Sequence, residues 1–183
     1  FDDLSLIFSS TTPNAQLTAF ASQLESAASA FFAVLDPSAV VNTNDSGVGS
    51  LRQAILNANN SQTSDGPIRF EIPGPGPYEI TLSTALPAIT VPRLVIDGKT
   101  QCCSSAPVIV LNGTDAGTGS DGLRIAAENV TIRGLVINRF GGNGINLMAS
   151  ASFSRILDNY VGTNSDGDAS QGDAGDGIHI QAG

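Results

Sequence analysis

The chain of 183 residues contains no tryptophan, one methionine and one histidine, and it carries little positive charge. Eight lysines and arginines stand against 17 aspartates and glutamates, so the formal net charge is −9. Nucleic acid and anionic membrane surfaces are recognised mainly through basic side chains, and this balance argues against both as partners. No run of 18 uncharged apolar residues occurs, which argues against a transmembrane segment.

The only two cysteines, Cys102 and Cys103, are adjacent, which excludes a disulfide framework joining distant parts of the chain. Because a bridge between neighbouring residues is sterically strained, three states stay open: two free thiols, a strained vicinal disulfide, or an intermolecular disulfide. Without a third cysteine or a nearby histidine, the pair makes a weak metal site. We interpret it as part of a corner of the chain without a catalytic role.

The two ends of the sequence favour a longer parent protein. The chain begins with Phe1 rather than Met, and no signal-peptide pattern precedes it, so we expect that a leader has been removed or that the chain is part of a longer one. Residues 176–183 stop in the middle of a repeat, which favours the second expectation. An open β edge promotes aggregation, so we expect something to cover this end.

Short runs of Val, Ile and Leu, separated by Gly and Asn, fill residues 122–162. Gly122-Leu-Arg-Ile recurs as Gly144-Ile-Asn-Leu after 22 residues, and Val130-Thr-Ile recurs near Arg155-Ile-Leu after about 24. This period is too short for a strand–helix–strand crossover, and the runs are rich in β-branched residues. One coil of two or three short strands cannot bury its apolar side chains alone, so coils must stack. The pattern predicts a parallel β-solenoid.

A wider series of segments resembles the start of right-handed parallel β-helix proteins of the pectin-lyase-like superfamily, which carry an SLREAI-type opening. The segments are Val41-Asn-Thr-Asn-Asp-Ser-Gly-Val-Gly-Ser-Leu-Arg-Gln-Ala-Ile-Leu-Asn-Ala-Asn59, Ile68-Arg-Phe-Glu-Ile, Tyr78-Glu-Ile-Thr-Leu, Leu86-Pro-Ala-Ile and Leu94-Val-Ile-Asp-Gly98. The resemblance implies a right-handed β-helix and a secreted or surface-anchored protein. It does not select a function, because this architecture hosts lyases, hydrolases, epimerases, adhesins and structural proteins.

The resemblance and the residue patterns together divide the chain at residue 40. Residues 1–40 are predicted to form an N-terminal strand–helix segment, and residues 41–183 a parallel β-helix that is truncated or continued at its C-terminus. Ser50 is the predicted N-cap of a short helix, Leu51–Asn57, with Leu51, Ile55 and Leu56 on one side. In the resembling proteins such a helix plugs the start of the solenoid. Arg52 is then expected to bind carbonyl groups of the first coil.

The N-terminal segment contains one predicted strand and one predicted helix. Leu4–Phe8 alternates as a strand, and an apolar stripe follows helical spacing from Gln16 to Leu35. The helix either packs against its own domain or docks on a neighbouring subunit or membrane surface.

Two segments leave their apolar runs through the same Asx–Gly pair, Asp97-Gly98 and Asn112-Gly113. We expect Asp97 and Asn112 to stack in register in successive coils and to bind backbone groups of the corner.

A long acidic insertion separates the last two repeats. Gly144-Ile145 and Gly177-Ile178 are 33 residues apart, and residues 163–176 account for the excess. Excursions of this kind from one wall of a solenoid are frequent binding sites. The insertion contains four carboxylates with spacing that suits calcium, although the twelve-residue calcium loop with its final Glu is missing; a solvated acidic loop is the alternative. The predicted calcium ligands are Asp166, Asp168, Asp173 and Asp176.

Catalytic candidates are few. Hydrolysis requires two carboxylates within several ångströms, and Asp158 with Asp176 one coil further on is the best available pair. Arg133 and Arg155 are candidates for a base or a carboxylate clamp along neighbouring coils. The strings Asn-Thr-Asp, Gly-His-Gly and Arg-Ile-Lys, typical of hydrolases with this fold, are absent, and the single histidine, His179, alternates with apolar residues and should face outward.

We therefore expect an extracellular or cell-surface structural or adhesive β-helix module, part of a larger surface protein or an assembly. Its expected partners are further repeats of the same chain or other copies stacked end to end. The alternative is a carbohydrate-active enzyme or carbohydrate-binding module, a lyase, hydrolase or epimerase, acting on acidic polysaccharide.

Overall fold

The computed structural model describes residues 22–24, 36–61, 66–101 and 106–181. This part of the chain is mainly β-structure, and its strands form three sheets in which every strand pair is parallel. The first sheet has the order β1 (Ala39–Val40), β2 (Ile68–Phe70), β4 (Val95–Asp97), β7 (Thr131–Arg133) and β10 (Arg155–Leu157). The second has the order β11 (Tyr160–Val161), β8 (Leu135–Asn138), β5 (Ile109–Asn112) and β3 (Tyr78–Thr81). The third has the order β12 (Ile178–Ile180), β9 (Ile145–Leu147) and β6 (Leu123–Ile125).

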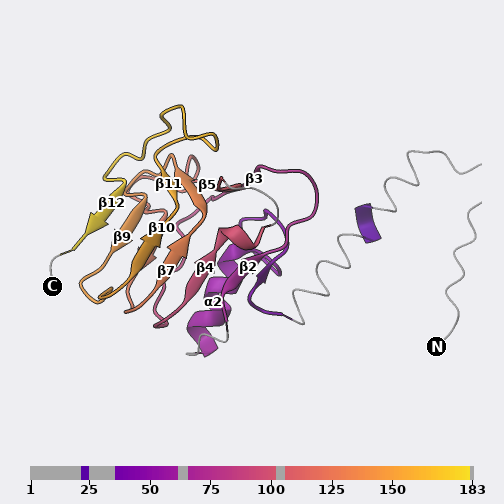
Figure 1. Ribbon diagram of the computed structural model, residues 1–183, viewed down its shortest axis with the longest axis horizontal. Coiled ribbons are helices and arrows are strands. Elements are labelled where there is room, and N and C mark those ends of the chain that lie inside the picture. The colour runs from indigo at the N-terminus through magenta and orange to yellow at the C-terminus, as the bar shows by residue number, and fades with distance from the viewer. Residues whose placement is uncertain (1–21, 25–35, 62–65, 102–105, 182–183) are drawn as a thin grey trace, which may run out of the picture.

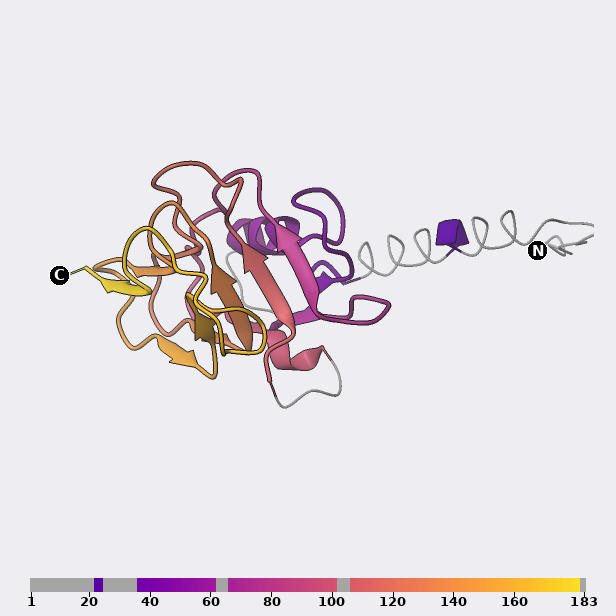
Figure 2. The ribbon, with the colours of Figure 1, turned by 90° about the horizontal axis from the view of Figure 1, so that it is seen from above.

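The chain visits the three sheets in a repeating order. From β6 to β12 each strand lies in a different sheet from the one before it, and every third strand pairs with its predecessor in the same sheet. An isolated parallel bridge between Ile89 and Ile125 places Ile89 beside β6 of the third sheet. Figure 2 shows the strands of successive turns lying side by side across the molecule.

The strand register agrees with the repeats in the sequence. Leu123 pairs with Ile145 after 22 residues, and Thr131 pairs with Arg155 after 24. Ile178 pairs with Ile145, so the third sheet continues across the 33-residue step and residues 163–176 form an excursion between β11 and β12.

The core lies between the sheets and is built from aliphatic residues. Neighbouring strands place the same kind of side chain inward, and Ile96 with Ile132 and Leu111 with Ile137 are all completely buried. Each such side chain contributes about 1.5–3 kcal/mol when it leaves water. Because one coil exposes both of its apolar rims, this burial depends on the coils on either side.

The helix α2 (Leu51–Ser61) lies at one end of the row of strands, with β12 at the other end (Figure 1). The Ser50 hydroxyl accepts a hydrogen bond from the Gln53 N–H at 3.2 Å, so Ser50 is the N-cap as predicted. Leu51, Ala54 and Ile55 are buried in the core. The helix continues four residues beyond the predicted end, and Leu56, predicted to lie on the same side as Leu51 and Ile55, is 36% exposed.

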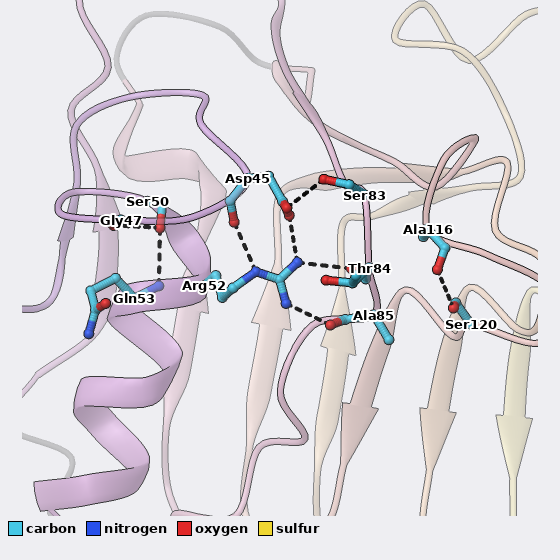
Figure 3. Close-up of polar contacts among 10 residues, drawn as sticks. All are labelled: Asp45, Gly47, Ser50, Arg52, Gln53, Ser83, Thr84, Ala85, Ala116 and Ser120. Carbon is cyan, nitrogen blue, oxygen red and sulfur yellow. Dashed lines mark hydrogen bonds and ion pairs between the residues drawn. The ribbon is translucent and has the colours of Figure 1, made fainter.

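Arg52 joins this helix to the first coil, as expected (Figure 3). Its guanidinium donates to the carbonyl groups of Thr84 at 2.9 Å and Ala85 at 2.6 Å. It also forms an ion pair with Asp45 at 2.5 Å, and the Asp45 carboxylate accepts a second hydrogen bond from the Ser83 hydroxyl at 2.7 Å. One side chain thus ties the helix, the loop before it and the first coil together.

The prediction for the two Asx–Gly corners is confirmed for their local hydrogen bonds but not for their stacking. Asp97 and Asn112 both accept a hydrogen bond from the backbone N–H two residues further on, as expected. They do not stack on each other, because Asp97 lies in β4 of the first sheet and Asn112 in β5 of the second. Asn112 stacks on Asn138 instead.

Several predicted features lie outside the described residues, among them the strand Leu4–Phe8, most of the helix from Gln16 to Leu35, and both Cys102 and Cys103. Residues 22–24 are helical. Val40, placed in the N-terminal segment from the sequence, pairs with Phe70 in the first sheet. Within the described ranges no helix combines the length and the apolar character needed to cross a membrane.

Candidate functional site

A threefold sequence motif places polar side chains on the outer face of the third sheet. Asp121-Gly-Leu-Arg124, Asn143-Gly-Ile-Asn146 and Asp176-Gly-Ile-His179 each lead into one of its strands, β6, β9 and β12. Arg124, Asn146 and His179 occupy the same register position in these neighbouring strands. We call the surface formed by the following six residues the polar face: Asp121, Arg124, Asn143, Asn146, Asp176 and His179.

Asp121 is the hydrogen-bond centre of the polar face. Its Oδ1 accepts from the backbone N–H and the side-chain amide of Asn143, both at 2.8 Å, and its Oδ2 accepts from the Asn146 amide at 2.7 Å. Burial alone would raise the pKa of Asp121, but these hydrogen bonds and the charge of Arg124 lower it below its ordinary value. The carboxylate therefore stays ionised and rigidly held.

The same network continues into the last coil. Asn143 Oδ1 accepts from the Asp176 N–H at 2.9 Å, and Asn146 Oδ1 accepts from the Gln181 side chain at 3.3 Å. Asp176 Oδ2 lies 2.8 Å from His179 Nδ1, an exposed carboxylate–imidazole pair. As predicted, His179 faces outward. The polar face exposes the Arg124 guanidinium, the His179 ring and the Asp176 carboxylate to solvent, a set that can bind hydroxyl or carboxylate groups.

Glycine in the motif permits the close stacking of its three copies. A Cβ on Gly122 would lie 2.5 Å from the Gly144 carbonyl oxygen, and a Cβ on Gly144 would lie 2.7 Å from the Gly177 carbonyl oxygen. Both distances are shorter than any tolerated contact, so an alanine at either position must push two coils apart.

The excursion of residues 163–176 folds against the coil beneath it. Asn164 Oδ1 accepts from the Asp168 and Ala169 N–H groups, and an antiparallel bridge joins Thr163 to Ser170. The Asn138 amide, at the end of β8, donates to the Thr163 carbonyl at 2.8 Å and to Gln171 Oε1 at 2.9 Å.

Asp173 anchors the far side of the excursion. Its Oδ1 accepts from the Phe140 N–H at 2.9 Å, whereas its Oδ2 is buried and has no hydrogen-bond partner within the described residues. Burial raises the pKa of Asp173, and the single hydrogen bond from Phe140 only partly opposes this.

The four predicted calcium ligands have separate surroundings. Asp166 is exposed, Asp168 binds the Asn164 amide at 2.8 Å, Asp173 is anchored to Phe140, and Asp176 pairs with His179. Across the described part of the chain, no group of three or more His, Cys, Asp or Glu side chains is arranged to hold a metal ion. Calcium binding by these four residues together stays a prediction.

The catalytic candidates also have separate partners. Asp158 forms an ion pair with Lys99 at 2.9 Å, and Asp176 pairs with His179, so the two carboxylates are engaged at different corners. Arg133 forms an ion pair with the buried Asp97 at 2.5 Å. The hydrogen bond from Arg133 to the Asp97 carboxylate, together with the negative charge of Asp97, raises the pKa of Arg133. Arg155 has no ion pair with any described residue and lies exposed on β10.

Sequence reasoning missed Asp121, Asn143 and Asn146 as members of one network. The repeated Asx-Gly-x-x string was the available signal, because its copies fall at the same register position of adjacent coils. Comparison of the chain with protein-family models, curated proteins and solved structures yields no match. Its function has to be inferred from the residues themselves.

Proposed function

We propose that the chain is a right-handed parallel β-helix of the pectin-lyase-like type that serves as a structural or adhesive module of an extracellular or cell-surface protein. The order in which the strands visit three parallel sheets supports the coiled architecture. Helix α2, whose apolar side packs into the core, supports a cap at the N-terminal end.

The observation that carries the structural role is the apolar surface of the last coil. Ile178 and Ile180 are 46% and 73% exposed, whereas Ile145 and Leu147, their register partners in the preceding coil, are 0% and 9% exposed. The same positions one coil earlier, Leu123 and Ile125, are completely buried. Aliphatic side chains with this spacing are buried wherever another coil covers them.

A further β coil fits this surface better than any small ligand would. It would bury Ile178 and Ile180, at about 1.5–3 kcal/mol for each side chain, and would pair with the backbone of β12. The coil can belong to the same protein or to another copy. Because α2 covers the opposite end, stacking extends the module in one direction only.

Light scattering combined with intact mass spectrometry on material from the native source tests the structural role. The proposal expects either a parent chain longer than the one described or an assembly heavier than the 18.7 kDa of one chain. A stable monomer of 18.7 kDa, with Ile178 and Ile180 accessible to solvent, would overturn it.

A second candidate function, binding or cleavage of acidic polysaccharide, is favoured by the Asp176–His179 pair on the same outer face as Arg124. An imidazole held by a carboxylate is a suitable general base, and a guanidinium binds a uronate carboxylate. An assay on pectate and alginate with calcium present tests this candidate. Unsaturated product that is lost in the Asp176→Asn and Arg124→Ala variants would support it, and the absence of both product and binding would reject it.

A further inference from the structure

Two buried oxygen atoms, one in the excursion and one in the coil beneath it, have no hydrogen-bond donor among the described residues. They are Asn138 Oδ1 and Asp173 Oδ2. The Asn138 side chain is almost completely buried, with 1% of the residue exposed. Buried polar atoms in folded proteins nearly always have a partner, and each exception requires a physical explanation.

Both oxygens belong to groups that join the same two stretches of chain. The Asn138 amide donates to Gln171 at 2.9 Å, and the other oxygen of Asp173 accepts from the Phe140 N–H at 2.9 Å. Residues 138–140 and 171–173 therefore face each other through two side chains. Each of these side chains has one anchored atom and one unpartnered oxygen.

The surroundings of Asp173 lack a compensating positive charge. Residues 163–176 contain four aspartates and no lysine or arginine. Arg139, next to Phe140, is exposed, and the ion pairs of the described residues do not include either Arg139 or Asp173. Water molecules could donate to these oxygens but would leave the carboxylate charge uncompensated. A hard cation would supply both the missing partner and the missing charge.

We propose that Asn138 and Asp173 are the side-chain ligands of a calcium-class cation site that fastens the excursion to the coil beneath it. Calcium accepts neutral amide oxygens, backbone carbonyls and water beside a carboxylate, so two side chains can form the protein part of an incomplete shell. The site moves the calcium prediction away from the exposed Asp166 and Asp168 to two buried oxygen atoms. It does not depend on the proposed structural function.

Titration of the full chain with calcium chloride, followed by calorimetry and by thermal unfolding against an EDTA control, tests the site. We expect saturable binding of one ion per chain and a rise in Tm. Asp173→Asn keeps the shape and the acceptor for Phe140, and it should weaken the affinity about tenfold or more. Matched controls in the same excursion, Asp166→Asn and Asp168→Asn, should change the affinity much less, because their carboxylates lie outside the pair.

A second variant keeps the test decisive if Asp173→Asn folds poorly. Asn138→Asp adds a negative oxygen but removes the amide donors to Thr163 and Gln171, so it should lower Tm in EDTA and enlarge the rise in Tm that calcium produces. Absence of calcium binding by the unaltered chain would overturn the site. So would binding lost in the Asp166 and Asp168 variants but retained in Asp173→Asn. The site would also be rejected if Asp173→Asn raised Tm while calcium had no effect on the unaltered chain. In that case a proton or a water molecule, not a cation, would be the partner of the two oxygens.

Discussion

Asp121 and Asn146, 25 residues apart in the chain, are joined by a hydrogen bond of 2.7 Å from the Asn146 amide to Asp121 Oδ2. The bond crosses from the strand β6 region to β9, and two further hydrogen bonds from Asn143 reach the other oxygen of the same carboxylate. A single ionised group therefore holds two successive coils of the third sheet together on their outer side.

This arrangement predicts acid sensitivity. Because the folded state lowers the pKa of Asp121 below its ordinary value, the carboxylate contributes stability that is present above that ordinary value and is lost as pH falls through the folded pKa. Asp121→Asn should be less stable than the unaltered chain at neutral pH and should lose less stability between neutral and strongly acidic pH. Urea unfolding across this range measures the effect. Asp115→Asn, on an exposed residue, is the control, and an equal pH dependence in all three proteins would contradict the prediction.

Removal of Arg52 should loosen the helix from the first coil. Arg52→Ala leaves the Thr84 and Ala85 carbonyls without their donor and Asp45 without its ion pair, and it should lower the free energy of unfolding by about 2 kcal/mol. Chemical denaturation measures the change. The control is Arg155→Ala, because Arg155 has no ion pair with any described residue. The free energy of unfolding of this variant should stay within about 0.5 kcal/mol of the unaltered chain. Similar losses in both variants would contradict the role of Arg52.

A methyl group at Gly144 should separate two coils. Gly144→Ala would place a Cβ 2.6 Å from Val161 Cγ1 and 2.7 Å from the Gly177 carbonyl oxygen, and it should destabilise the chain by about 1–3 kcal/mol. Gly172→Ala is the matched control, since a Cβ there meets nothing within 4 Å. Thermal unfolding of the two variants compares them directly. Equal Tm values would show that the third sheet tolerates wider spacing.

Polar substitution of the last coil should reduce self-association without unfolding the chain. Ile180→Ser removes a side chain that is 73% exposed, so it costs little burial within one chain but weakens contact with a covering coil. We expect a lower mean mass by light scattering and an unchanged circular dichroism spectrum. Val48→Ser, on an apolar residue outside the last coil that is 52% exposed, should leave the mass unchanged. A loss of mass in the control alone would place the association surface elsewhere.

Short repeats in the sequence predicted the strand register where the coils are short. The 22-residue step from Leu123 to Ile145 is found as a strand pair, because each coil repeats the same alternation of inward apolar and outward polar residues. The start of α2 was equally predictable, since Ser50 is a local capping residue. Its end was not, because Ala58 packs against the core and extends a helix that the asparagine-rich local sequence does not favour.

The polar contacts were predictable only in part. The Asx–Gly pairs at Asp97 and Asn112 bind their own corners as expected, since that interaction spans two residues. Their assignment to one stack was wrong, because the pattern of an apolar run followed by Asx–Gly is the same in both sheets. Membership of a sheet depends on how many residues each preceding corner uses.

By itself, the sequence determined that this chain forms short, parallel, stacked strands, because no other arrangement buries apolar runs with so short a period. It also determined the acidic excursion at residues 163–176. Only the tertiary structure decided which polar groups meet. Lys99 reaches Asp158 across 59 residues, and the excursion returns to the coil beneath it through the bonds of Asn138 to Gln171 and of Phe140 to Asp173. Whether two distant side chains come into contact depends on the length and direction of every corner between them. A local sequence pattern does not contain this information.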